Sequence, residues 1–218
     1  MSAGLSYAVD VVVCIDATAS MVPFADSIEF MALTWPEAVR ARMAEVDKRV
    51  DQLRVRVIAF RDTVADAESL VASDFFTLPD DREAFLDFVA RITFDGGGDE
   101  PESGLEALAV AINSAWTADG DRRRHVIVIM TDASAHPLEK GVGKVPSAFA
   151  SQIPSSFDEL SDMWTGGQAT LVLFTPDMSP WSTIIQHWGN VVMFPSQGGV
   201  VPSPVEYDEI IDILVTGV

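Results

Sequence analysis

The stretch at residues 9–21, "VDVVVCIDATASM", decides the fold. It begins as a run of mostly β-branched, apolar residues, which is typical of a buried β-strand. The run ends at Asp16, and the hydroxyl residues Thr18 and Ser20 follow at alternate positions. A strand that ends in three oxygen-bearing side chains presents them at the edge of a sheet. We therefore expect a ligand site directly after this strand.

Strand and helix patterns alternate along the rest of the chain. The further predicted strands are 53–62, 74–78, 123–133, 169–176 and 190–196. The predicted helices are 27–50, interrupted by Pro36, 80–92, 102–116, 157–164, 180–188 and 206–215. This alternation predicts an α/β sandwich with a central, mostly parallel sheet of about six strands, in which 74–78 is an antiparallel edge strand. The long irregular segment 135–156 is a candidate functional loop.

Composition and charge exclude several classes of protein. The chain has 218 residues, of which 48% are hydrophobic, and no apolar run is long enough to cross a membrane. We expect a single globular domain over residues 1–218. The net charge of −19 repels a phosphate backbone and makes nucleic acid an unfavourable partner. The first residues lack the pattern of a secretory signal, and the single cysteine, Cys14, lies in an apolar strand, so we expect a cytoplasmic protein.

Three loops in the sequence carry oxygen ligands suited to a hard cation. They are "DATAS" after the first strand, "FDGGGDEPES" at 94–103, and "TDASAH" at 131–136. Ligands of parallel sheets bind where strand ends diverge, so the three loops are expected to meet at one edge. Mg²⁺ prefers oxygen ligands in octahedral geometry, with Mn²⁺ and Ca²⁺ as alternatives. The predicted metal site comprises Thr18, Ser20 and Asp99 near the ion, with Asp16 and Asp132 orienting them from behind.

Each acidic residue also has an ordinary structural interpretation. Asp16 and Asp132 are suited to cap helices, and Glu100 and Glu102 are suited to the N-terminal dipole of the helix that follows them. His136 is a candidate for the rim of the site. The occurrence of three such loops in order, each after the appropriate element, favours the metal site.

These motifs resemble those of von Willebrand factor type A domains. "DATAS" is similar to the DxSxS pattern of the metal ion-dependent adhesion site, with Thr18 in place of the first serine. "TDA" matches the third loop, and "GGGDEPE" resembles the second loop with Asp99 where integrin-type domains have threonine. The pairing is particularly similar to domains attached to atypical alpha-kinases and their bacterial relatives. The resemblance implies a Rossmann-like fold over the whole chain and assigns the metal to the five residues named above.

Three functions remain open from the sequence. The resemblance implies a noncatalytic module that recruits a protein partner through an acidic residue bound to the metal. It also implies that the partner is an ATPase or kinase of the same stress or defence system, and that the chain is a bacterial scaffold or adaptor. The rim lysines Lys140 and Lys144 are expected to help such an acidic ligand. The alternatives are a metal-dependent phosphohydrolase that uses Asp16 as its nucleophile, and a scaffold in which the metal only ties the loops together.

Overall fold

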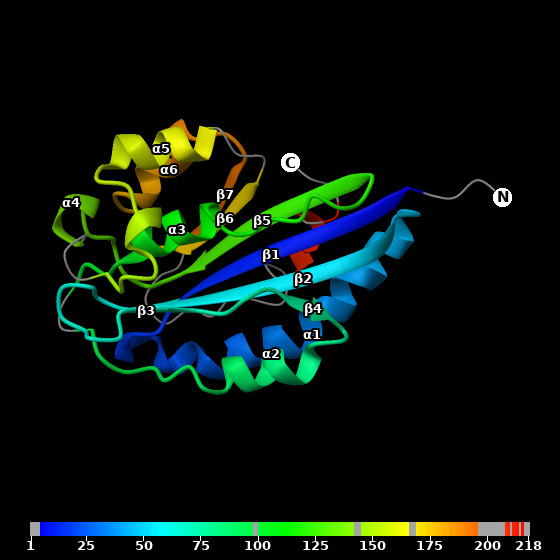
Figure 1. Ribbon diagram of the computed structural model, residues 1–218, viewed down its shortest axis with the longest axis horizontal. Helices are drawn as coiled ribbons and strands as arrows, with labels where there is room; N and C mark the ends of the chain where they lie inside the picture. The colour runs from blue at the N-terminus through cyan, green and yellow to red at the C-terminus, as the bar shows by residue number, and fades with distance from the viewer. Residues whose placement is uncertain are drawn as a thin grey trace.

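A seven-stranded sheet runs through the molecule with helices on both faces (Figure 1). The computed structural model describes residues 5–97, 100–141, 145–165 and 169–195, together with 208, 209, 211–213 and 215. The strands are β1 (Ser6–Asp16), β2 (Arg49–Phe60), β3 (Leu70–Ala72), β4 (Phe76–Leu78), β5 (Arg122–Met130), β6 (Thr170–Thr175) and β7 (Val191–Pro195). The helices are η1 (Ala19–Phe24), α1 (Ala25–Glu45), α2 (Arg82–Val89), α3 (Gly104–Ile112), α4 (Leu138–Gly141), η2 (Ala150–Gln152), α5 (Phe157–Thr165) and α6 (Trp181–His187).

The sheet has the strand order β3-β2-β1-β5-β6-β7, and β4 also pairs with β2. The five long strands β2, β1, β5, β6 and β7 are parallel to one another, whereas β3 and β4 are antiparallel to β2. The mixed sheet with an antiparallel edge confirms the predicted fold class. The predicted edge strand at 74–78 contains β4. The three residues of β3 are too few to show an alternating pattern, so the sequence did not reveal this second short strand.

The buried residues of β1 face both helical layers. Val9, Val11, Val13 and Ile15 belong to the core that also contains buried residues of α1 and α2. Val12 and Cys14 belong to the other core, which contains buried residues of α3, α5 and α6. Side chains alternate between the two faces of a strand, so a central strand covered on both sides is apolar at nearly every position. The continuous apolar run at the start of the sequence is therefore a consequence of the three-layer architecture.

The ends of β1 and β5 lie at the point where the chain connections diverge. The two strands are parallel neighbours, with Ile15 paired to Met130. After β1 the chain passes to α1 on one face of the sheet, and after β5 it passes to α4 and α5 on the other face (Figure 1). In open α/β sheets, ligands bind at the carboxyl ends of the strands where the connections diverge in this way. The predicted metal loops follow these two strands.

Most of the predicted helices are present over shorter ranges, whereas α5 ends one residue later than predicted. Part of the predicted helix 206–215 lies outside the described residues, and its described residues are helical. α1 continues through Pro36, and α3 begins at Gly104. The irregular segment 135–156 contains the short helices α4 and η2, and its residues 142–144 lie outside the described part of the chain. Within the described residues, no helix has the length and apolar character needed to cross a membrane.

Candidate metal site at the carboxyl edge of the sheet

Asp16 is the buried centre of the first loop. It is the last residue of β1 and has no exposed surface. Its Oδ1 accepts hydrogen bonds from the Thr18 amide at 2.9 Å and the Thr18 hydroxyl at 2.6 Å, and its Oδ2 accepts one from the Thr131 hydroxyl at 2.6 Å. Burial raises the pKa of Asp16, and hydrogen bonds from Thr131 and Thr18 oppose this effect. The carboxylate therefore orients hydroxyl groups of the first and third loops.

The hydroxyls of Thr18 and Ser20 have different carboxylate partners. The Thr18 hydroxyl donates to Asp16, and the Ser20 hydroxyl donates to Asp132 Oδ1 at 3.0 Å. The two hydroxyl oxygens lie 3.0 Å from each other. Each hydroxyl has one proton and two lone pairs, so directing both protons to carboxylates leaves lone pairs available for a cation.

The spacing of these two hydroxyl oxygens fits an octahedral cation. Mg²⁺ holds oxygen ligands at about 2.1 Å in octahedral geometry, so neighbouring ligands lie about 3 Å apart. The Thr18–Ser20 oxygen separation of 3.0 Å has this length. Among the residues that the structure describes, no three His, Cys, Asp or Glu side chains are grouped to hold a metal ion. The fit therefore depends on hydroxyl oxygens, with Asp16 and Asp132 supplying negative charge behind them.

The second loop lies directly against the first. The Asp95 amide donates to the Ala17 carbonyl at 3.0 Å, and the Ala19 amide donates to the Gly96 carbonyl at 3.4 Å. These bonds carry the chain toward the site immediately before the expected ligand Asp99. Gly98 and Asp99 themselves lie outside the described residues, as do Lys144 and the side chain of Lys140.

Gly97 allows the second loop to approach the first this closely. Its φ is +69°, a backbone conformation that favours glycine. A Cβ at this position would lie 2.9 Å from Cβ of Thr18 and 2.9 Å from Glu102 Oε1. The glycine-rich sequence is therefore required here by both backbone conformation and space.

Glu102 is a member of the site that the sequence interpretation missed. It was expected to complement the dipole of α3, but the residue is only 5% exposed, and its Oε2 has no hydrogen-bond partner among the residues that the structure describes. Burial and the nearby charges of Asp16, Asp62, Asp66 and Asp132 raise its pKa to about 8. An acid just before a helix usually lies in solvent, so only the tertiary structure reveals that this one is buried.

The backbone of Glu102 also joins the second and third loops. Its amide donates to the Ser134 carbonyl at 3.0 Å, and its carbonyl accepts from the His136 amide at 2.8 Å. Glu102 and Ala135 form an isolated parallel bridge. All three loops are therefore in contact, as the sequence predicted, although Asp99 is not among the described residues.

Glu106 is a second buried carboxyl close to the site. It lies one helical turn beyond Glu102 and has no exposed surface, and neither of its carboxyl oxygens has a hydrogen-bond partner in the described ranges of the chain. Burial raises its pKa to about 7, and the charge of Asp62 adds to this effect. Sequence patterns do not reveal the burial of this residue, because a glutamate in an apolar helix is normally on its exposed face.

Comparison with known proteins adds information at the level of the fold. No family model matches the chain, and no curated protein matches it. The von Willebrand factor type A structure from Catenulispora acidiphila is similar with a TM-score of 0.54 and 14% identity, over 96% of this chain and 42% of that one. The pilus adhesin SpaC from Lactobacillus rhamnosus GG is similar with a TM-score of 0.55 and 10% identity, over 96% of this chain and 31% of that one.

The chain spans less than half the length of each of these two structures. Their low sequence identities limit the likeness to the fold, and the predicted relation to alpha-kinase-associated domains stays a prediction. The mostly parallel sheet with its antiparallel edge is consistent with this likeness. The chain therefore has the fold of a von Willebrand factor type A domain.

Proposed function

We propose that the chain is a noncatalytic protein-binding module whose binding depends on a divalent cation, with Mg²⁺ as the preferred ion. Thr18, Ser20 and Asp99 would hold the ion, and Asp16 and Asp132 would orient the hydroxyls. Glu102 is added as a further candidate ligand, because its buried Oε2 has no hydrogen-bond partner within the described part of the chain. When bound, the ion would supply an open coordination position for an oxygen of the partner.

One observation carries this proposal. Thr18 and Ser20 place two hydroxyl oxygens 3.0 Å apart, and each hydroxyl has a carboxylate to accept its proton. A helix cap would instead direct its side chain at a backbone amide of the helix, and Thr18, the N-cap residue of η1, makes no such side-chain hydrogen bond in the described structure. The arrangement is therefore better suited to a cation than to capping.

The proposed ligand from the partner is an aspartate or glutamate side chain. The carboxylates of this site offset much of the charge of a divalent ion. Positively charged side chains near the site are therefore needed to attract the acidic residue of the partner. An ATPase or kinase of the same multiprotein system is the first partner to test.

A metal titration tests the site itself. Metal-stripped protein is titrated with Mg²⁺ by calorimetry, alongside Ser20→Ala and Asp16→Ala. We expect saturable binding by the parent and a loss of about tenfold or more in affinity for both variants. Binding of Mg²⁺ by both variants with the affinity of the parent would show that the ion is held elsewhere.

A pull-down tests the function. Candidate partners are captured with parent protein and with Ser20→Ala, each in Mg²⁺ and in EDTA. We expect capture by the parent in Mg²⁺ only. Capture that persists in EDTA would favour the scaffold in which the metal only ties the loops.

The phosphohydrolase is the competing proposal, and Asp16 argues against it. A nucleophilic aspartate needs a carboxylate oxygen that substrate can reach, whereas Asp16 is buried and accepts three hydrogen bonds. Magnesium-dependent hydrolysis of a phosphate ester that disappears in Asp16→Asn would overturn the noncatalytic assignment.

A further inference from the structure

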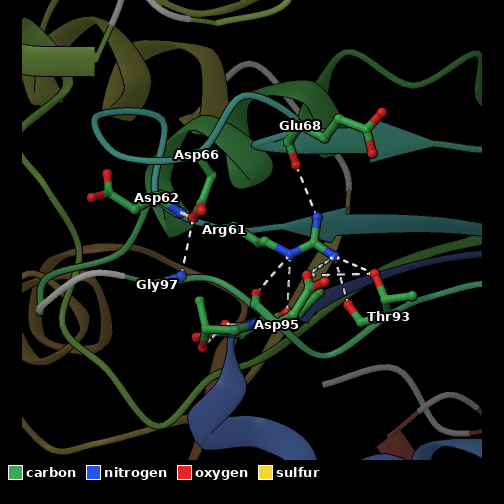
Figure 2. A network of polar contacts seen from close by, with 10 residues as sticks. Arg61, Asp62, Asp66, Glu68, Thr93, Asp95 and Gly97 are labelled. Carbon is green, nitrogen blue, oxygen red and sulfur yellow. Dashed lines mark hydrogen bonds and ion pairs between the residues drawn. The ribbon is translucent and has the colours of Figure 1, made fainter.

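We propose that the turn at residues 61–66, which follows β2, is a positioning element that holds the three metal loops in register. The turn contains none of the predicted ligands, yet it contacts all three loops and the start of α3. This inference rests on the proposed metal site and adds Arg61 and Asp66 as the residues through which the turn acts. Figure 2 shows both residues and their contacts with the second loop.

Arg61 joins the first loop to the second. Its side chain is 10% exposed, and its Nε donates to the carbonyls of Ala17 at 3.1 Å and Asp95 at 2.9 Å. Its Nη2 donates to the carbonyl of Thr93 at 2.6 Å and to the hydroxyl of the same residue at 2.9 Å. Ala17 lies between Asp16 and Thr18, so the guanidinium ties the segment that leads to Asp99 directly to the first loop.

The carbonyl contacts of Arg61 matter more than its ion pair. Arg61 Nη2 lies 3.0 Å from Asp95 Oδ1, but the Asp95 side chain is 71% exposed. Exposed ion pairs contribute little, whereas hydrogen bonds from a buried charge to carbonyl oxygens are among the stronger ones. A further bond from Nη1 to the carbonyl of Glu68, two residues beyond the turn, at 2.9 Å also fixes the guanidinium.

Asp66 holds the second loop from its other side. Its Oδ2 accepts a hydrogen bond from the Gly97 amide at 3.1 Å, two residues before Asp99. A Cβ on Gly96 would lie 2.5 Å from Asp66 Oδ1, so the carboxylate fills the space left by that glycine. The second loop is thus fixed at 93–95 by Arg61 and at 97 by Asp66.

The middle of the turn contacts α3 and the third loop. The Thr63 amide donates to the Ser103 hydroxyl at 2.9 Å, and the two hydroxyl oxygens lie 2.8 Å apart. His136 Nε2 lies 3.2 Å from Asp62 Oδ1, although without hydrogen-bond geometry. Through these contacts one short turn can set the relative positions of all the elements that carry ligands.

The experiment separates positioning from simple attraction of the cation. Asp66→Ala removes both the charge and the acceptor of Asp66, whereas Asp66→Asn removes the charge and keeps an acceptor oxygen for Gly97. Arg61→Gln and Arg61→Lys test the role of the Arg61 guanidinium in the same way. Arg54→Gln is the matched control, because Arg54 lies in β2 and binds the Asp10 carboxylate and the Ala115 carbonyl away from the site. A thermal unfolding curve first shows that each variant is folded. A fresh sample of the folded variant is then titrated with Mg²⁺.

We expect Asp66→Ala to weaken Mg²⁺ binding about tenfold or more, and Asp66→Asn to retain most of the affinity. Arg61→Gln should weaken binding to a similar extent, Arg61→Lys less so, and Arg54→Gln not at all. Equal losses in the Ala and Asn variants would reduce Asp66 to an electrostatic role and overturn the inference. Asp66 is more exposed than Arg61, so its variants are expected to fold. They test the positioning role even if Arg61→Gln does not fold.

Hydrogen exchange in EDTA provides a readout that does not depend on the metal. Loss of Asp66 or Arg61 should speed exchange of the amides at 95–97 and leave the amides of β6 unchanged. Unchanged exchange at 95–97 in both variants would overturn the positioning role even if the parent binds Mg²⁺. If the parent binds no Mg²⁺, the proposed function fails, and the exchange result alone decides whether the turn holds the second loop.

Discussion

The Ser20 hydroxyl donates a hydrogen bond to Asp132 Oδ1 at 3.0 Å and so connects two loops that are 112 residues apart in sequence. The bond lies at the surface, with Ser20 itself exposed. Surface contacts of this kind contribute little to folding, whereas the position of a ligand oxygen directly affects a bound ion. Stability and cation binding should therefore respond differently to changes in this loop.

Replacement of Ser20 by alanine should separate the two properties. We expect the free energy of unfolding in EDTA to change by no more than about 0.5 kcal/mol, because the side chain is exposed. In Mg²⁺ the parent should gain thermal stability that the variant lacks, because a ligand that binds only the folded state stabilises it. Thermal unfolding with and without Mg²⁺ measures both effects, and an equal gain in the two proteins would exclude Ser20 from the site.

Replacement of Gly97 by alanine should disturb the site through the backbone. The φ of +69° disfavours a side chain by about 1–2 kcal/mol, and the new methyl group would also meet Thr18 and Glu102. We expect a lower free energy of unfolding and weaker Mg²⁺ binding. Gly189→Ala is the matched control, because a Cβ there would have no neighbour within 4 Å among the described residues. Equal free energies of unfolding and equal Mg²⁺ affinities in the two variants would mean that the second loop moves readily to accommodate the methyl group.

Glu106 should make the metal-free protein less stable as the pH rises. Its pKa is about 7 in the folded chain against an ordinary value of 4.5, so the folded state binds the proton more tightly than the unfolded state. The stabilisation from this proton is complete below pH 4.5 and is lost as the pH rises toward 7, by about 3 kcal/mol in all.

Denaturant unfolding in EDTA at pH 5 and pH 8 measures this loss. Glu106→Gln cannot ionise, so the difference in stability between the two pH values should shrink by the contribution of Glu106. An unchanged difference would show that Glu106 finds a partner or reaches solvent when it ionises.

Asp10 should contribute to stability but not to cation binding. It is fully buried in β1, and its carboxylate accepts hydrogen bonds from Arg54 at 2.8 and 2.6 Å and from the Thr117 amide at 2.7 Å. Asp10→Ala leaves the Arg54 charge and the Thr117 amide unsatisfied, so we expect a loss of about 3 kcal/mol or more. Mg²⁺ affinity measured on the folded variant should match that of the parent, and a parallel loss would mean that the two ends of the sheet are coupled.

The sequence contains enough information for the fold and for the order of the site loops. The apolar run of β1, with hydroxyl and acidic residues directly after it, predicts both a central strand and a ligand edge. These are local patterns, and three-layer packing requires them. The hydroxyl and carboxylate residues after β1 and β5 can therefore be assigned to one edge of the sheet from the sequence alone.

The residues that escaped prediction depend on contacts between distant segments. Glu102 and Glu106 match the acids found at many helix starts and faces, and their burial is visible only in the folded chain. Arg61 follows a strand like many exposed arginines, and its partners at Ala17 and Thr93 are 44 and 32 residues away. Such roles are set by tertiary contacts and have no periodic signature in a single sequence.

The burial of Cys14 makes the chain a convenient host for a reporter dye. Cys14 is the only cysteine, has no exposed surface, and directs its thiol at the Ala107 carbonyl, with Sγ and the oxygen 3.8 Å apart. Burial also raises the pKa of the thiol, which keeps it in the unreactive protonated form. A cysteine introduced at Val22, which is 54% exposed and two residues beyond Ser20, would therefore be labelled selectively in the folded protein without removal of the native thiol. Fluorescence from that one position would then report directly on events at the carboxyl edge of the sheet.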